Sequence, residues 1–212
     1  MKRLALIGAG KLGYRFAYHA FADKHYQPVG FFDDDITKNK QHPELPLLGT
    51  IDDIHDSFKK GQFDFLLISI GYCYFDKKEE LFDRFKNHIP FGTIIHSSSY
   101  VDKSCKIESG VFIFPGCVLD MNVQIRHNTT IGNGSVISHD SIIENNCWLS
   151  PSVNIAGSVK IGQKVNLGIG TTVIDNIVIS DNIRTGGGTV VVDNLDLPGL
   201  YVGVPARLIK AK

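Results

Sequence analysis

Branched aliphatic residues recur every six positions through the second half of the chain, and this period restricts the possible fold more than any other feature. Starting at Ile95, the series continues with Val101, Ile107, Ile113, Leu119, Ile125, Ile131, Ile137, Ile143, Leu149, Ile155, Ile161, Leu167, Val173 and Ile179. The residue after each of them is mostly polar or glycine, so the period does not reflect general hydrophobicity. A period of six fits neither an α-helix nor a long alternating strand. It predicts short strands that turn a corner every six residues around an apolar interior, which is a β-solenoid.

A second inward position lies four residues after each aliphatic and holds small or β-branched residues. The series reads Cys105, Val111, Cys117, Val123, Thr129, Ser135, Ser141, Cys147, Val153, Val159, Val165, Thr171 and Ile177. It contains three of the four cysteines, which we therefore interpret as small buried hydrophobes. The cysteines show no C-x2-C pairing and no histidines at metal-ligand spacing, so no metal is predicted.

The first half of the chain has the pattern of a small parallel α/β domain. Residues 4–7 predict a strand that enters the glycine turn 8–13, a G-x-G-x-x-G arrangement whose backbone amides can receive phosphates. Residues 29–32 and 63–70 predict two further strands, and Asp33, Asp34 and Asp35 follow the first of these. An acidic residue that binds a ribose would stand at about this place. The glycines could equally serve close helix packing alone, and the acids could form a solvated turn.

Composition limits the classes of partner. Among 212 residues, 22 acidic side chains balance 22 basic ones, which gives no electrostatic bias toward nucleic acid or anionic lipid. The apolar run at residues 4–7 is far shorter than a signal-peptide core or the roughly 20 residues that span a bilayer. We expect a cytoplasmic protein, with no membrane insertion, that binds small molecules and copies of itself.

The repeats resemble those of hexapeptide-repeat acyltransferases, in segments such as Ile131–Val136 and Ile161–Asn166. The resemblance implies a left-handed β-helix with three sides per coil, assembled as a homotrimer. Both halves in this order resemble the bacterial nucleotide-sugar N-acetyltransferases of the bacillosamine and perosamine type and related sialic-acid O-acetyltransferases. The implied organisation is a Rossmann-like α/β nucleotide-sugar-binding domain over residues 1–92 and a β-helix acetyltransferase domain over residues 93–212.

The same resemblance assigns roles to individual residues. Gly8, Gly10 and Gly13 would form the phosphate turn for the acceptor's nucleotide, Asp33 and Asp34 would contact the nucleoside, and Gly71 with Tyr72 would lie at the pocket edge. Acetyl-CoA is the implied co-substrate. Gly157, one coil beyond His139, would stand at the acetyl carbonyl, and Ile169 and Gly187 would line the pantetheine channel.

Transfer of an acetyl group to an amine needs a general base, and histidine suits this role near neutral pH. Of the eight histidines, His127 and His139 lie well inside the solenoid. His139 precedes Asp140, as the catalytic histidine of the family precedes an acidic residue. We therefore predict His139 as the base and Asp140 as the carboxylate that orients it. Neighbouring residues on a flat strand face opposite ways, so this pairing requires a corner or bulge.

Two positions depart from the family pattern, and several functions stay open. Trp148 stands where many relatives have a second histidine, and Gly132 where they often have asparagine. The leading hypothesis is an acetyl-CoA-dependent N-acetyltransferase for a nucleotide-linked amino-deoxy sugar. The alternatives are a sugar O-acetyltransferase, a solenoid that binds without catalysis and, last, an NAD oxidoreductase.

Overall fold

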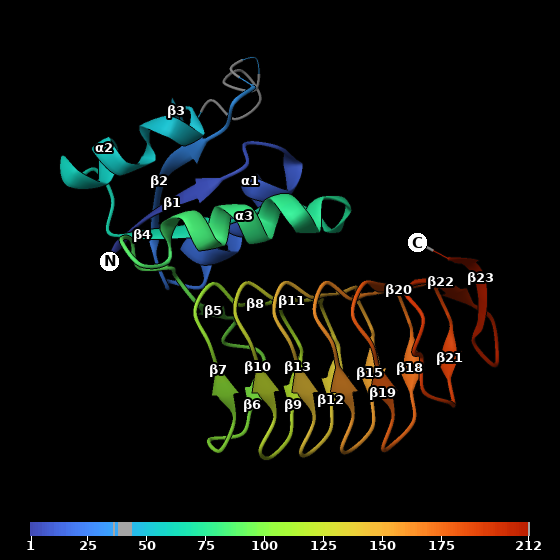
Figure 1. Ribbon diagram of the computed structural model, residues 1–212. Helices are drawn as coiled ribbons and strands as arrows, with labels where there is room; N and C mark the ends of the chain where they lie inside the picture. Colours follow the sequence, from blue (N-terminus) through green and yellow to red (C-terminus); the bar gives the residue numbers. More distant parts are fainter. Residues whose placement is uncertain (36, 38–43, 212) are drawn as a thin grey trace. The chain divides into compact units, whose positions relative to one another are not determined.

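The structure, a computed structural model, describes residues 1–35, 37 and 44–211. Contacts between Cα atoms divide it into two compact units, Met1–Ile94 and Ile95–Lys212. Figure 1 shows an α/β unit and a coiled β unit. None of the helices in the described residues combines the length and the apolar character that a membrane crossing needs.

The first unit is built on a parallel sheet with strand order β3-β2-β1-β4 (Figure 1). Its strands are β1 (Arg3–Ile7), β2 (Gln27–Phe32), β3 (Leu47–Gly49) and β4 (Phe65–Ile68). The helical segments are α1 (Lys11–Ala22), η2 (Ile51–Asp53), α2 (Ile54–Lys59), η3 (Tyr72–Tyr74) and α3 (Phe75–Phe85). β1 is buried along almost all of its length, as expected for the centre of a parallel sheet covered on both faces. The three predicted strands correspond to β1, β2 and β4, whereas the short strand β3 was not predicted.

The turn after β1 is packed tightly against α1 and β4. A Cβ on Gly13 would lie 2.0 Å from the carbonyl oxygen of Gly8, so this approach of helix to turn requires glycine. The Ser69 hydroxyl, just after β4, donates to the carbonyl of Ile7 at 2.9 Å or to that of Gly8 at 3.1 Å. The glycine turn is therefore fixed before any ligand arrives.

The second unit is a β-helix of short strands stacked on three sides, all in parallel except the last strand, which pairs antiparallel (Figure 1). The eight-stranded side holds β5 (Ile94–Ile95), β8 (Phe112–Ile113), β11 (Thr130–Ile131), β14 (Trp148–Leu149), β17 (Asn166–Leu167), β20 (Ile183–Thr185), β22 (Gly199–Val202) and β23 (Arg207–Ala211). The six-stranded side holds β6 (Tyr100–Val101), β9 (Val118–Leu119), β12 (Val136–Ile137), β15 (Asn154–Ile155), β18 (Thr172–Val173) and β21 (Val190–Val191). The five-stranded side holds β7 (Lys106–Ile107), β10 (Gln124–Ile125), β13 (Ile142–Ile143), β16 (Lys160–Ile161) and β19 (Val178–Ile179). The predicted fold class, an α/β domain followed by a left-handed β-helix, is confirmed.

The interior of the β-helix consists of the two inward series found in the sequence. From Ile113 to Ile179, every aliphatic of the six-residue series belongs to one buried core cluster. Cys117 and Cys147 are fully buried in the same cluster, and Cys105 packs against it. Burial raises the pKa of the Cys117 thiol, which disfavours the reactive thiolate. These three cysteines are therefore packing residues, and Cys73 is an exposed thiol on η3.

Three columns of corners join the sides of the β-helix. The first corner joins the six-stranded to the five-stranded side and contains residues 121–122, 139–140, 157–158 and 175–176. The second corner joins the five-stranded to the eight-stranded side and contains residues 127–128 and 145–146. The third corner joins the eight-stranded to the six-stranded side and contains residues 169–170 and 187–188. The second residue of each of these pairs has a φ between 56° and 68°. Asn, Asp and Gly tolerate this left-handed conformation best, which explains their frequency at these positions.

Candidate active site

The first corner brings His139 and Asp140 together. Asp140 has a φ of 58°, and this left-handed turn lets the two consecutive side chains meet. The Nδ1 atom of His139 lies 2.9 Å from Oδ2 of Asp140. The hydrogen bond from His139, followed by one from Asn122, lowers the pKa of the Asp140 carboxyl below its ordinary value. An ionised Asp140 accepts a hydrogen bond from Nδ1–H, so Nε2 of the neutral imidazole is left as the basic atom.

Gly157 lies directly against the imidazole, one coil beyond it. A Cβ at this position would lie 2.6 Å from both Cε1 and Nε2 of His139. The Ser158 N–H also donates to the His139 carbonyl at 2.9 Å, which ties the two coils at this corner. Any larger residue at position 157 would displace the ring, so this glycine provides the space that the histidine occupies.

Ile169 and Gly187, predicted for the pantetheine channel, lie together at the third corner. Ile169 is 60% exposed, and a Cβ on Gly187 would be 3.1 Å from its Cγ2 atom. One complete side of the β-helix, the six-stranded one, separates this corner from that of His139 and Gly157. A single chain therefore carries the predicted acetyl-CoA residues on two different edges.

The six-stranded side between these two corners has an apolar patch on the outer surface of its first three strands, whereas β15 presents the exposed Asn154. Tyr100, Val118 and Val136 are its exposed outward residues on β6, β9 and β12. Beside the first corner, Ile174 is also exposed. In a monomer this surface would stay in contact with water, which is unfavourable for a contiguous apolar patch.

Trp148 and Gly132 both belong to the eight-stranded side, which is the side opposite the first corner. Trp148 pairs in register with Thr130 and Asn166, and the neighbouring Leu149 is the inward residue. Neither position shares a corner with His139 of the same chain.

His127, the other histidine considered as a base, occupies the second corner and has different partners. Its Nε2 atom lies 3.0 Å from Oε2 of Glu108, and its Nδ1 atom lies 3.1 Å from the Ser109 hydroxyl. Glu108 also accepts a hydrogen bond from Arg126 at 2.7 Å. Both ring nitrogens of His127 are thus engaged in a local polar network, which favours a structural role.

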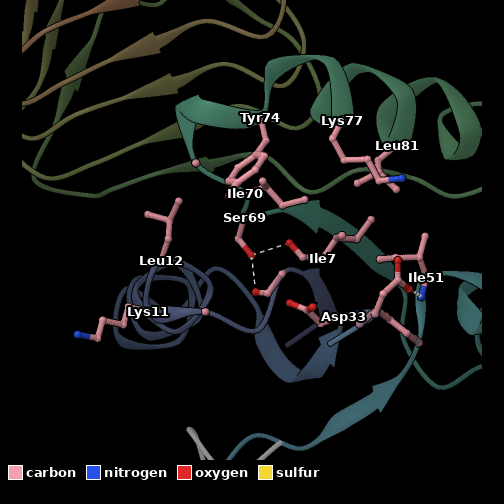
Figure 2. Close-up of a pocket in the computed structure, with 15 residues that line it drawn as sticks. Ile7, Lys11, Leu12, Asp33, Ile51, Ser69, Ile70, Tyr74, Lys77 and Leu81 are labelled. Atoms are coloured by element: carbon pink, nitrogen blue, oxygen red, sulfur yellow. Dashed lines mark hydrogen bonds between the residues drawn. The ribbon is translucent and has the colours of Figure 1, made fainter. Parts of the chain in front are cut away.

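The α/β unit contains a pocket of about 400 Å³ at the carboxyl ends of its strands. Five of the seven residues predicted for nucleotide binding line it: Gly8, Gly10, Asp33, Asp34 and Gly71. Figure 2 shows Asp33, Ser69 and Ile7 around the same hollow, with Tyr74 beside Ile70. Gly10 caps α1 without a side chain, and a Cβ there would meet no atom within 4 Å. The first turn of α1 therefore opens onto free space, an arrangement suited to an anionic group.

Both predicted acids also shape the pocket. Oδ2 of Asp33 accepts the Ala9 N–H at 2.8 Å and so links the end of β2 to the glycine turn. Oδ1 of Asp34 accepts the Ile51 N–H at 3.0 Å and holds the start of η2. These contacts place the two carboxylates at the pocket wall, where their remaining acceptor capacity can meet hydroxyl or N–H groups of a ligand.

The other two predicted residues do not line this pocket. Gly13 is buried against Gly8, as its close packing requires, and Tyr72 is an exposed residue of η3 outside the lining. Tyr74, two residues later, lines the pocket instead, as do Lys11 and Lys77. These three residues could not be predicted from the sequence, because a lysine or tyrosine on a helix carries no local signal of a binding role.

Comparisons with known proteins agree with both units. Residues 3–85 match the family model of the PglD N-terminal domain. The crystal structure of PerB from Caulobacter crescentus in complex with CoA and GDP-perosamine is similar, with 25% identity and a TM-score of 0.90 over 99% of this chain and 98% of that one. A mutant of GDP-perosamine N-acetyl transferase from the same organism, with the same ligands, gives 25% identity and a TM-score of 0.91 over 99% and 97%.

The acetyltransferase domain of PglB from Neisseria gonorrhoeae FA1090 has the same fold. It is 21% identical, with a TM-score of 0.90 over 99% of this chain and 100% of that domain. Together these matches confirm the resemblance to the bacterial nucleotide-sugar N-acetyltransferases of the hexapeptide-repeat type.

Proposed function

We propose that this protein transfers the acetyl group of acetyl-CoA to the amine of a nucleotide-linked amino-deoxy sugar, for the biosynthesis of a surface polysaccharide or glycan. The observation that carries the proposal is the 2.9 Å contact between His139 Nδ1 and Asp140 Oδ2 at a corner where Gly157 leaves room for the ring. The structural relatives PerB and GDP-perosamine N-acetyl transferase were crystallised with CoA and GDP-perosamine, which supports both substrate classes. Both co-substrates are cytoplasmic metabolites, so we propose the cytoplasm as the compartment.

In the proposed reaction His139 acts as a general base and no acyl-enzyme forms. The neutral amine attacks the thioester carbonyl carbon while Nε2 accepts a proton from the nitrogen, and the electron pair of the C=O bond moves to oxygen. The tetrahedral intermediate then collapses, the C–S bond breaks, and the imidazolium returns the proton to the departing CoA sulfur. Asp140 holds Nδ1–H throughout and stabilises the positive charge of the imidazolium. A main-chain amide near Gly157 is the proposed partner of the oxyanion, as the family resemblance implies.

We propose a homotrimer, because the two sets of acetyl-CoA residues lie on different edges of one chain. If three β-helices turn their six-stranded sides toward a common axis, the first corner of each chain meets the third corner of its neighbour. His139 and Gly157 of one subunit would then face Ile169 and Gly187 of the next. The same arrangement covers the exposed Val118 and Val136. Acceptor and donor would thus react between subunits.

The trimer predicts that a charge on the six-stranded side separates the subunits. Val136→Glu should give monomers and strongly reduced turnover, because a carboxylate cannot be buried against an apolar neighbour without a large cost. Val178→Glu is the matched control, since Val178 lies on the five-stranded side and is 41% exposed, against 37% for Val136. Light scattering should report three chain masses for the wild type and the control. A monomeric, fully active wild type would contradict the trimer.

The acceptor site predicts a separation of the two Michaelis constants. Replacing Asp33 and Asp34 together with alanine should raise KM for the nucleotide sugar about 10-fold or more, since hydrogen bonds to charged groups are lost. KM for acetyl-CoA should stay nearly unchanged. Asp52→Ala is the control, because Asp52 is exposed, pairs with Arg84 at 2.7 Å and does not line the pocket. Equal effects on both substrates would argue against separate roles for the two units.

The experiment that tests the proposed function directly is product analysis. Purified protein is incubated with acetyl-CoA and a panel of UDP-, dTDP- and GDP-linked amino sugars, and the acetylated product is read by mass spectrometry. Formation of an amide with one member of the panel supports the proposal. An ester product would identify an O-acetyltransferase instead, and binding of acetyl-CoA without any transfer would indicate a non-catalytic protein.

A further inference from the structure

Asn122 extends the polar contacts of the first corner by one coil. Its Nδ2 atom donates to Oδ1 of Asp140 at 3.0 Å, while Oδ2 of the same carboxylate meets His139 Nδ1 at 2.9 Å. We propose that Asn122 is a positioning residue for acetyl transfer, which holds Asp140 in the orientation that fixes the His139 ring. This inference rests on the proposed function, in which His139 is the base.

The exposure of the pair explains why a third residue is needed. The side chains of His139 and Asp140 are 48% and 47% exposed, and a polar contact this exposed is weak because water competes and both side chains lose rotamer freedom. With its first oxygen held by Asn122, the carboxylate cannot rotate away without breaking a second hydrogen bond. The contact thereby pre-organises Asp140 for the imidazole.

Asn122 is itself fixed from the preceding coil. Its left-handed φ of 61° places it in the same corner column as Asp140, and its N–H donates to the Ser104 hydroxyl at 2.8 Å. The Ser104 hydroxyl donates in turn to Oδ1 of Asp102 at 2.6 Å. The chain of contacts from Asp102 to His139 therefore crosses three coils, and Asn122 is its link to the carboxylate that meets the ring.

The other charged groups on this corner face other partners. Oδ1 of Asp120 accepts the Met121 N–H at 2.8 Å, and Oδ2 of Asp175 accepts the Asn176 amide at 2.6 Å. Lys103, the cation of the column, lies beside Asp102. Asp140 is thus the carboxylate that contacts the imidazole of His139, at 2.9 Å from Nδ1. Asn122 acts on the imidazole through Asp140.

The test begins with NMR on the trimer without substrates. Asn122→Gly keeps the left-handed corner but removes the amide, whereas Asn122→Asp places a carboxylate against Asp140. In ¹⁵N-histidine spectra, Asn122→Gly should shift neutral His139 from the Nδ1–H form toward a mixture of tautomers. Asn122→Asp should loosen the contact between Asp140 and His139 Nδ1 in the same spectra, because the two carboxylates repel each other. Asn182→Gly, at a left-handed position of the second corner, is the matched control and should leave the His139 signals unchanged.

Kinetics then separate positioning from general stability. Asn122→Gly should lower kcat about 10-fold, as expected for one lost hydrogen bond to a charged group, with KM for acetyl-CoA nearly unchanged. In an Asp140→Asn background the same substitution should cost little more, because Asn122 acts through that carboxylate. An equal loss in both backgrounds, or an unchanged His139 tautomer in Asn122→Gly, would overturn the positioning role. The NMR readout needs no substrate, so absence of acetyl transfer alone would overturn the proposed function and leave this test intact.

Discussion

Replacing His139 with alanine is expected to lower the rate of acetyl transfer by ~10²- to 10⁴-fold, the usual cost of removing a positioned general base. The variant should keep its trimer and its affinity for acetyl-CoA. The base contacts the reacting atoms, whereas the proposed donor contacts come from Gly157, Ile169 and Gly187. Steady-state kinetics, calorimetry with acetyl-CoA and light scattering check these three expectations.

The pH profile gives an independent measure of the same base. In the wild type, kcat/KM should rise with pH, because only the neutral form of a general base can accept a proton from the amine. Asp140 does not add a second pH-dependent step to this profile, because its lowered pKa keeps the carboxylate ionised at every pH above the ordinary carboxyl value. A rise with pH that disappears in His139→Ala therefore identifies His139 as the base.

Asp140→Asn is the graded companion to the histidine variant. The amide can still accept the Nδ1–H of His139 and orient the ring, but it cannot stabilise the positive charge that develops there. It should therefore lose less activity than His139→Ala. If His139→Ala kept near-wild-type turnover and the same pH profile, the base would lie elsewhere, and His127 would be the first residue to examine despite its contacts with Glu108 and Ser109.

The sequence predicts the β-helix well because each coil requires the same kinds of residue at the same inward positions. A narrow interior accepts one large aliphatic and one small residue per side, so the six-residue period extends without interruption from Ile95 to Ile179. The corners give a second signal in the sequence, because they favour residues that tolerate the left-handed turn, such as Asn122, Asp140 and Asn176. The meeting of His139 with Asp140 could therefore be expected once the corner was located.

The nucleotide pocket could be predicted only in part. Glycines mark the turn after β1, but the sequence does not show that Gly13 faces the Gly8 carbonyl and not a ligand. That distinction depends on how closely α1 packs, which is a tertiary property. Likewise, the single 3-10 turn η3 determines that Tyr74 lines the pocket and Tyr72 does not. Which of two tyrosines in an irregular turn faces the pocket cannot be read from any period in the sequence.

Gly157→Ala is expected to reduce acetyl transfer almost as much as removal of the histidine. The new Cβ would lie 2.6 Å from Cε1 and Nε2 of His139, closer than non-bonded atoms approach, so the ring must leave its place beside the backbone. A displacement of about 1 Å near the reacting atoms can cost on the order of 10²-fold in rate. The φ of Gly157 is not among the left-handed values, so alanine fits the backbone, and the fold and thermal stability should be retained.

A double-mutant cycle separates two explanations for this glycine. If Gly157 serves to make room for the imidazole, adding Gly157→Ala to His139→Ala should cost little further activity, because the alanine at position 139 no longer occupies the space. If the glycine serves instead to let the thioester approach the main chain, the two losses should multiply and KM for acetyl-CoA should rise in both backgrounds. The 2.6 Å separation favours the first result. A Gly157→Ala variant with wild-type turnover would show that the His139 ring adopts another position during catalysis.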